Sequence, residues 1–147
     1  MAFDYTDAVF TTPLIRAIAN NNVGGVREAL DRGFSANLPD NRGWTALHEA
    51  ASNEASSDCL REILAHSSAV VNSQTFEGNT PLFLACQNEC LDAVNLLLKH
   101  SKCDVNLANS EGVPPLHVAC SKGNLKIVRL LVECGAKVNA QDYNGYT

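Results

Sequence analysis

The chain has no run of about 18 apolar residues, few aromatic residues and no excess of positive charge. A helix that crosses a membrane needs such a run, and a protein that binds duplex nucleic acid needs clustered lysine and arginine. Here 11 Lys and Arg residues are scattered along 147 residues and are outnumbered by 16 Asp and Glu, for a net charge of -5. The first residues are acidic where a signal peptide would be basic. We therefore expect no membrane partner, no nucleic-acid partner and a cytoplasmic location, with the nucleus as an additional one.

Residue types used in catalysis and metal binding do not gather in any known pattern. The glycines occur about one to a turn instead of forming a phosphate-binding loop, and the serines cluster in turns without a base beside them. Cys86 and Cys90 have the spacing CxxxC, which is neither a zinc spacing nor a redox spacing. We therefore predict that the protein is not an enzyme and has no catalytic residue, no metal site and no cofactor.

The six cysteines could form a disulfide framework, but we expect reduced thiols in a reducing compartment. The positions expected to be buried are Cys59, Cys86 and Cys120, and the positions expected to be exposed are Cys90, Cys103 and Cys134.

The chain repeats itself every 33 to 35 residues, with related segments that start at Thr12, Thr45, Thr80 and Pro114. Two further residues recur at fixed distances before Thr45, Thr80, Pro114 and Thr147. Eight residues before each of these positions lies an asparagine (Asn37, Asn72, Asn106 and Asn139), and two residues before each lies a glycine (Gly43, Gly78, Gly112 and Gly145). A period of this length indicates a stack of similar units. Such a stack has no deep cleft, so it favours binding of a partner over catalysis.

Each unit predicts two short helices. A threonine can cap the first helix, and the proline that often follows fits the first helical position because its missing N–H costs nothing there. The predicted first helices are 13–20, 46–52, 81–87 and 115–121, and the predicted second helices are 23–32, 58–66, 91–100 and 125–134. The predicted second helices 58–66, 91–100 and 125–134 are too apolar to lie on a surface, so we expect them to be buried between units. The second unit has an insertion near residues 54–57, in the turn between its helices.

This pattern resembles the ankyrin repeat, most closely in residues 115–119, 123–125 and 135–139. The resemblance implies an all-α solenoid of paired antiparallel helices with β-hairpin-like finger turns. It divides a single, monomeric domain (1–147) into repeats at about 8–40, 41–75, 76–109 and 110–142, with 143–147 as the opening of a truncated fifth repeat. The periodic asparagines either brace their turns by side-chain hydrogen bonds or, as the resemblance also implies, are substrates of asparaginyl hydroxylation.

In ankyrin proteins the finger turns and first helices line a concave groove that binds a protein partner. Carried over to this sequence, the candidate partner-binding residues are Asn41, Arg42, Trp44, Glu49, Phe76, Glu77, Asn79, Leu84, Glu111 and Tyr143. We expect Arg42, Trp44, Phe76 and Tyr143 to be the anchors, because aromatic residues and arginine supply most interface energy. The alternative for Trp44 is that it packs on the neighbouring finger and only stabilises the stack.

Residues 40–44, 48–51, 75–78 and 81–85 further resemble the ankyrin-repeat-and-SOCS-box family, whose members are substrate receptors of cullin-RING ubiquitin ligases. This resemblance implies elongin and cullin as further partners, bound through a C-terminal region that is absent from these 147 residues. Two other roles stay open: a scaffold or inhibitor of a signalling protein or transcription factor, and a regulatory module of a longer enzyme or channel.

Overall fold

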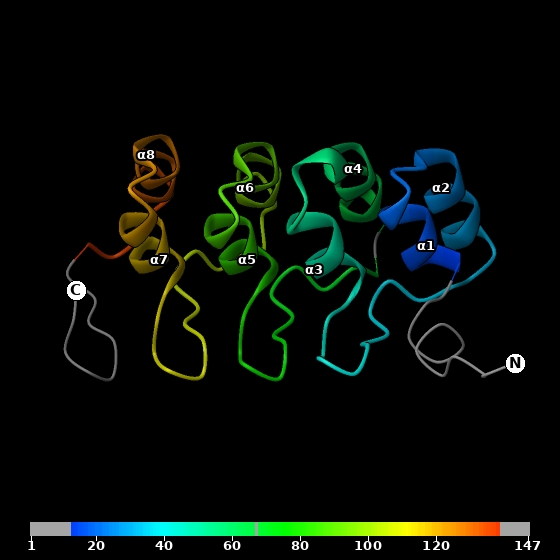
Figure 1. Ribbon diagram of the computed structural model, residues 1–147, viewed down its shortest axis with the longest axis horizontal. Coiled ribbons are helices and arrows are strands. Elements are labelled where there is room, and N and C mark those ends of the chain that lie inside the picture. The colour runs from blue at the N-terminus through cyan, green and yellow to red at the C-terminus, as the bar shows by residue number, and fades with distance from the viewer. Residues whose placement is uncertain (1–12, 67, 139–147) are drawn as a thin grey trace, which may run out of the picture.

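The computed structural model describes residues 13–66 and 68–138, which form four helix pairs in a row (Figure 1). The first helices of the pairs are α1 (Pro13–Ala19), α3 (Ala46–Ala51), α5 (Pro81–Gln87) and α7 (Pro115–Lys122). The second helices are α2 (Val23–Asp31), α4 (Ser57–Ala65), α6 (Leu91–Leu98) and α8 (Leu125–Glu133). These helices match the predicted ranges to within two residues at each end. The described ranges contain no strand and no helix that is long and apolar enough to cross a membrane.

The helices form two layers, and the finger turns project together from the layer of first helices (Figure 1). Within each layer a helix contacts the corresponding helices of the neighbouring pairs, as in the series α1, α3, α5, α7 and the series α2, α4, α6, α8. The core therefore extends along the stack as a strip between the layers. It is made of buried leucine, isoleucine, valine and alanine, with Leu47, Leu60 and Leu97 among its fully buried side chains. The predicted all-α solenoid is confirmed.

The inserted turn of the second unit forms a 3-10 helix, η2 (Glu54–Ser56), between α3 and α4. The side chain of Asn53 caps it by accepting a hydrogen bond from the backbone N–H of Ala55 at 3.0 Å. The hydroxyl of Ser56 donates to the carbonyl of Ile18, 3.3 Å away at the end of the preceding first helix. The extra residue is therefore accommodated at the helix-turn end of the unit and not in a finger.

His48 links the start of α3 to the next finger. Its Nδ1 accepts a hydrogen bond from the backbone N–H of Thr45 at 3.0 Å, so the ring proton lies on Nε2. Nε2 can then donate to the carbonyls of Ser73 and Asn79, at 3.0 and 2.9 Å. The ring is fully buried, and this burial holds the pKa of His48 below its usual range, although the two carbonyls act in the opposite direction. His48 therefore braces the start of α3 against the finger that follows.

The first helices α5 and α7 begin in different ways. Thr80 is the predicted N-cap of α5, and its hydroxyl oxygen accepts from the N–H of Phe83 at 3.0 Å. Pro114 precedes α7 in the same extended conformation but makes no capping hydrogen bond, since it has neither a hydroxyl nor an N–H.

The periodic asparagines join each repeat to the next. Each carboxamide donates one hydrogen bond and accepts another from the loop that follows the next second helix. Asn37 donates to the carbonyl of Ser68 and accepts from Val70, Asn72 pairs in the same way with Lys102 and Asp104, and Asn106 pairs with Gly135 and Lys137. The predicted bracing is confirmed at these three residues, although it extends to the neighbouring repeat and not only to the turn itself. Asn139 lies outside the described residues.

The burial of the cysteines corrects two expectations. Cys59 and Cys86 are buried as predicted, and burial raises the pKa of Cys86 to about 12. Cys90 was expected to be exposed, but it is buried because it directly precedes α6 and lies in the apolar core. Cys120 was expected to be buried and is instead exposed, since α7 belongs to the last described pair. Cys103 is half-buried, with its pKa raised to about 11, and Cys134 is exposed.

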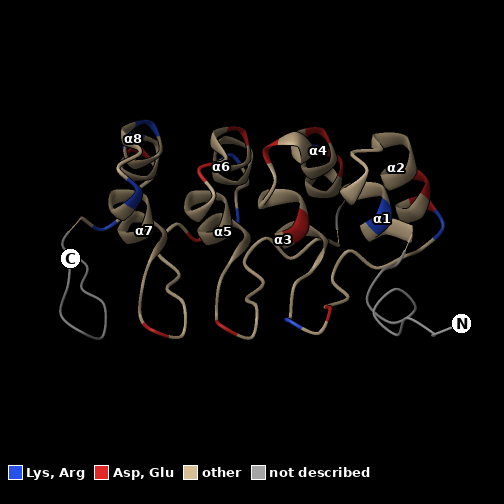
Figure 2. Ribbon diagram, viewed as in Figure 1, with Lys and Arg blue, Asp and Glu red and all other residues tan. Residues whose placement is uncertain are grey.

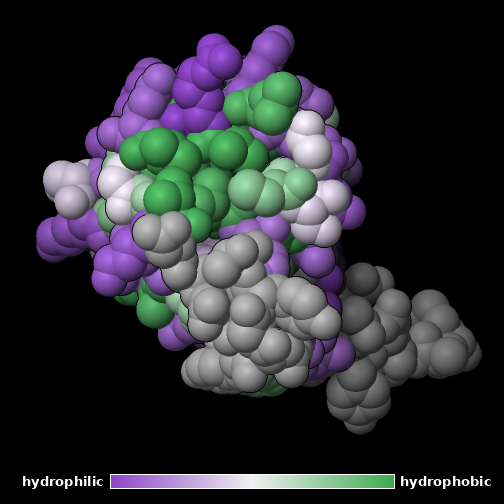
Figure 3. Space-filling view, turned by 90° about the vertical axis from the view of Figure 1, so that its left-hand side faces the viewer, coloured by the Kyte–Doolittle hydropathy of each residue, from purple (hydrophilic) through white to green (hydrophobic). Residues whose placement is uncertain are grey.

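The stack end formed by α7 and α8 carries a hydrophobic patch (Figure 3). Exposed apolar side chains in this region include Leu125 and Val132 on α8 and Val138 after it, and Leu125 is 75% exposed. By contrast, α6 packs against second helices on both sides, α4 and α8.

We predict that backbone amides in α6 exchange with solvent more slowly than those in α8. Repeat units draw most of their stability from neighbours, so a helix with two described neighbours should open less often than α8, whose only described neighbour in its layer is α6. Hydrogen exchange followed by NMR along both helices would measure this. Greater protection in α8 would contradict the prediction.

We also predict that His48 makes the protein less stable as the pH is lowered. Its folded-state pKa is depressed, so the unfolded chain binds the proton more readily and the stabilisation is complete only above the unfolded pKa of about 6.5. As pH falls from there towards the folded pKa, the free energy of unfolding should drop by up to about 1.4 kcal/mol per pH unit. Urea unfolding between pH 7.5 and 5.5 would show a steeper loss in the wild type than in His48→Gln. Equal slopes would exclude His48 as the cause.

Candidate functional site: a groove along the fingers

Each described finger is closed by the same backbone hydrogen bond. The N–H groups of Asp40, Thr75 and Asn109 donate to the carbonyls of Trp44, Asn79 and Val113 at 2.9 to 3.0 Å. The side chain of Asp40 also accepts from the N–H groups of Arg42 and Trp44, at 2.8 and 3.0 Å. The side chain of Asn109 accepts from its finger in the same way. The fingers are therefore well-defined hairpin-like turns, as predicted.

Neighbouring fingers are also bonded to one another. The N–H of Phe76 donates to the carbonyl of Arg42 at 3.1 Å, and the N–H of Ser110 donates to the carbonyl of Glu77 at 3.0 Å. This close approach leaves no room for a side chain at the glycine of the earlier finger. A Cβ on Gly78 would lie 2.5 Å from the nitrogen of Ser110, and the φ of this glycine is +82°. The fingers thus form a row with a fixed spacing.

Two adjoining cavities lie between the fingers and the first helices. The first encloses about 380 Å³ and is lined by Arg42, Trp44, Thr75, Phe76, Glu77, Asn79, Leu84 and Gln87. The second encloses about 410 Å³ and is lined by Glu77, Asn79, Phe83, Gln87, Asn109, Ser110, Glu111 and Val113. Because Glu77, Asn79 and Gln87 line both cavities, the two cavities are direct neighbours. We call them together the finger groove.

The groove brings together most of the residues predicted to bind a partner. Six of the ten line its first cavity, and they are Arg42, Trp44, Phe76, Glu77, Asn79 and Leu84. Glu111 lines the second cavity, and Glu49 contacts Arg42 from α3. Asn41 is exposed on its finger but lines neither cavity, and Tyr143 lies outside the described residues.

Two of these residues are less accessible than expected. Asn79 is only 7% exposed and Leu84 only 3% exposed, although both were expected on open surfaces. Asn79 is enclosed by its own finger and the next one, since its side chain bonds with that of Asn109 at 3.2 Å. Leu84 lies on α5, every residue of which except Gln87 is buried. Both therefore form the wall of the groove, whereas Phe76 is 73% exposed beside it.

Six lining residues are not among the ten candidates, and they are Thr75, Phe83, Gln87, Asn109, Ser110 and Val113. Thr75 and Asn109 occupy the same finger position as Asp40, at intervals of 35 and 34 residues. The repeat register itself could therefore have identified these two. Phe83 replaces the histidine found at position 48, and its direction depends on packing that the register does not specify.

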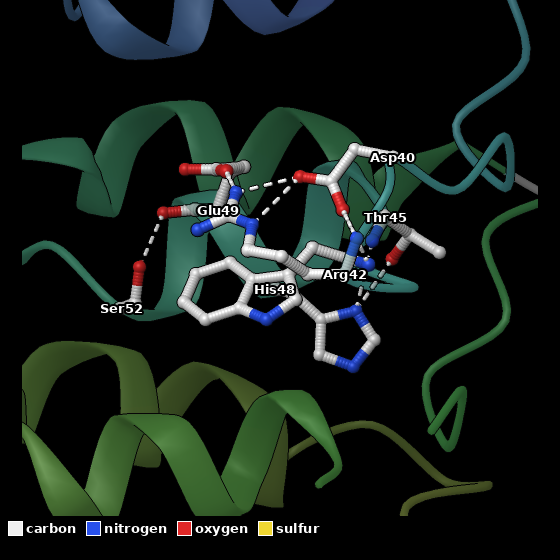
Figure 4. A network of polar contacts seen from close by, with 7 residues as sticks. Asp40, Arg42, Thr45, His48, Glu49 and Ser52 are labelled. Atoms are coloured by element: carbon white, nitrogen blue, oxygen red, sulfur yellow. Dashed lines mark hydrogen bonds and ion pairs between the residues drawn. The ribbon is translucent and has the colours of Figure 1, made fainter. Parts of the chain in front are cut away.

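A charged cluster occupies the first end of the groove (Figure 4). The guanidinium of Arg42 donates to Asp40 at 2.6 Å and also to the carboxylate of Glu49. Its central carbon lies 4.0 Å from the centre of the Trp44 ring. We call Asp40, Trp44 and Glu49 the clamp, since they hold one cation between an aromatic face and two carboxylates. Burial would raise the pKa of Asp40, but hydrogen bonds from Arg42 and from the N–H of Trp44 outweigh it and hold that pKa below its usual range.

The indole of Trp44 contacts residues of its own repeat. Besides Arg42, the recorded ring contact is with His48, at a centroid distance of 6.3 Å. The ring is half-buried and lines the groove. Its position is thus compatible with partner contact as well as with a role in bracing α3.

The rest of the groove is acidic. Figure 2 shows an acidic residue at the tip of the fingers before α5 and α7, and a basic residue at the tip of the finger before α3. The acidic residues are Glu77 and Glu111, and among the described residues neither forms an ion pair. Within the same part of the chain, no group of three His, Cys, Asp or Glu side chains could hold a metal ion. The chemistry that the groove offers is therefore that of an acidic, partly aromatic binding surface.

Comparison with known proteins identifies ankyrin repeats along the chain. A family model of ankyrin repeats in three copies matches residues 3–75 and 55–142. The chain is 37% identical over 83 residues to ankyrin repeat and SOCS box protein 3 of Bos taurus and of Homo sapiens. It is 38% identical over 89 residues to SMC5-SMC6 complex localization factor protein 1 of Homo sapiens. These matches cover 55% and 60% of this chain but only 15% and 8% of the two kinds of relative.

We predict that Gly78→Ala destabilises the protein more than Gly33→Ala. Both glycines have positive φ, which costs an alanine about 1–2 kcal/mol. A Cβ at Gly33 would meet nothing within 4 Å, whereas at Gly78 it would clash with the backbone of the next finger. Urea unfolding of both variants measures the difference. Equal losses would mean that the fingers can separate without cost.

Proposed function

The chain belongs to the ankyrin-repeat family, and we propose that the finger groove is the surface through which it binds a protein partner. Ankyrin repeats mediate binding of protein partners and are generally not catalytic, so the chain is a protein-interaction module. The observation that carries the assignment to the groove is the exposed ring of Phe76, which lines a hollow together with Arg42 and Trp44.

The composition of the groove supports this proposal. Aromatic residues and arginine contribute most of the binding energy at protein interfaces, and they do so when a rim of weaker contacts excludes water around them. Here the aromatic side chains of Trp44 and Phe76 lie together at one end, and polar side chains such as Gln87 and Ser110 surround the remaining hollow. Hydrogen bonds within and between the fingers fix the backbone that carries these side chains before a partner arrives, which reduces the ordering cost of binding.

We further propose that the groove recruits the substrate of a ubiquitin ligase. The similarity to ankyrin repeat and SOCS box protein 3 supports this role. In that case elongin and cullin would bind a SOCS box elsewhere in a longer protein, while the repeats, acting as a monomer in the cytoplasm and also in the nucleus, would hold the substrate. Coprecipitation of elongin with the full-length protein tests this role, and its absence would argue against it.

A second candidate is a scaffold that brings one protein to another. The similarity to SMC5-SMC6 complex localization factor protein 1 favours this alternative, since that protein is named for localising a complex. The same groove would serve in both roles. Recovery of partners without elongin from the full-length protein would favour the scaffold.

We predict that the double variant Trp44→Ala and Phe76→Ala loses about 2 kcal/mol or more of partner binding, the range of interface anchors. Its fold should change little, because Phe76 is exposed and Trp44 is only half-buried. The measurement is a quantitative pull-down with the wild-type and variant proteins, together with a thermal melt of each.

The matched control is Leu97→Ala, which truncates a fully buried side chain of α6. It should lower the free energy of unfolding by roughly 2–5 kcal/mol and should reduce binding only through unfolding. Normal binding of every partner by the finger double variant would place the binding surface elsewhere on the molecule.

A further inference from the structure

Building on the proposed function, we propose that the clamp is a binding site for a basic side chain of the protein partner, and that Arg42 fills this site until the partner displaces it. The partner segment would then be basic, with one arginine or lysine in the clamp and further positive charge facing the acidic fingertips.

The clamp has the chemistry of a cation receptor. A guanidinium 4.0 Å from an indole centre is a close cation–π contact, and tryptophan is the aromatic residue that binds cations best. The two carboxylates come from different elements, Asp40 from the finger and Glu49 from α3, and both bond to the same guanidinium. A planar guanidinium suits such a site because it can stack on a ring and donate hydrogen bonds along its edges at the same time.

The clamp does not need the side chain of Arg42 to keep its shape. The finger is closed by the backbone bond between Asp40 and Trp44 and by the carboxylate of Asp40, which accepts from two backbone N–H groups. It is joined to the next finger through the carbonyl of Arg42, which belongs to the backbone. The Arg42 side chain is itself 49% exposed. Because its ion pairs are partly open to water, they are weak enough for a competing cation to replace them.

The charge of the groove selects the sign of the competitor. Asp40, Glu49, Glu77 and Glu111 face the groove or its clamp. Among the residues that the structure describes, Arg42 is the only positive one that lines either cavity. An acidic partner would meet like charges at the fingers that carry Glu77 and Glu111, which disfavours it by repulsion. A basic partner replaces the positive charge in the clamp once Arg42 is displaced. It also meets Glu77 and Glu111, which have no ion-pair partner among the described residues.

The first test fills the clamp of Arg42→Ala with ethylguanidinium, a small stand-in for the arginine side chain. Trp44 is the only tryptophan of the chain, so its indole N–H resonance in an NMR spectrum reports directly on the clamp. In Arg42→Ala this resonance should shift and saturate as ethylguanidinium is added at constant ionic strength. In the wild type the response should be about ten-fold weaker, because the internal cation already occupies the site.

Two matched variants control this titration. Arg32→Ala removes a guanidinium that lies 5.6 Å from the ring of Phe34 and forms no ion pair within the described residues, and it should behave like the wild type. Adding Glu49→Gln to Arg42→Ala should abolish the saturable shift. If Arg42→Ala keeps a native amide spectrum but shows no saturable shift, the clamp is not a cation site and the inference is wrong.

The second test uses peptides selected on the wild-type protein from a random displayed library. The selected sequences should be enriched in arginine or lysine, and replacing the arginine of the best peptide by neutral citrulline should weaken it about ten-fold, the effect of losing a charged hydrogen-bonding partner. Arg42→Ala should bind the same peptide about three- to ten-fold more tightly, since the internal competitor is gone, whereas Glu49→Gln should bind it less tightly.

Three outcomes would overturn the inference: weaker or unchanged peptide binding by Arg42→Ala, selected peptides without basic residues, or no selected peptide at all. The proposed function has a separate readout. Loss of partner binding in the Trp44 and Phe76 double variant would still support a binding role for the groove, even if the clamp proved to be a purely structural contact.

Discussion

Consecutive repeats are connected by hydrogen bonds between an asparagine side chain of one repeat and the backbone of the next. Asn37, Asn72 and Asn106 each satisfy one carbonyl and one N–H of the next loop, so the connection has two hydrogen bonds and a fixed direction. Two bonds to one planar group restrict rotation as well as separation. Because each repeat is oriented in this way by its predecessor, both helix layers and the row of fingers keep their alignment along the stack.

The finger groove depends on that alignment. Each finger contributes only a few side chains to the groove. A hollow forms where the fingers that end before α5 and α7 approach their neighbours closely enough to share backbone hydrogen bonds. His48 adds a second connection, since it caps α3 and bonds to the finger that follows. The binding surface is therefore a property of adjacent repeats and not of any one of them.

The sequence predicted the parts of the structure that recur and missed those that depend on neighbours. Residue type at a repeated position was enough to predict the helix pairs, the N-cap of α5 at Thr80 and the asparagine contacts. It was also enough to predict most of the finger residues of the groove. Burial at particular positions does not: Cys90 and Leu84 are buried by packing across elements, and Cys120 is exposed on the last described pair. The ion pair between Arg42 and Glu49 was also missed, because it depends on the relative placement of a finger and α3.

The short helix η2 has a consequence for how such a protein can change. Its extra residue is absorbed between α3 and α4, at the end of the repeat where the helices turn, while the asparagine bonds and the finger contacts on either side keep their geometry. The number of residues in this turn therefore does not affect the spacing or the orientation of the fingers. Insertions there can alter the outline of one edge of the molecule while the arrangement of the groove stays the same, so the two surfaces are free to diverge independently.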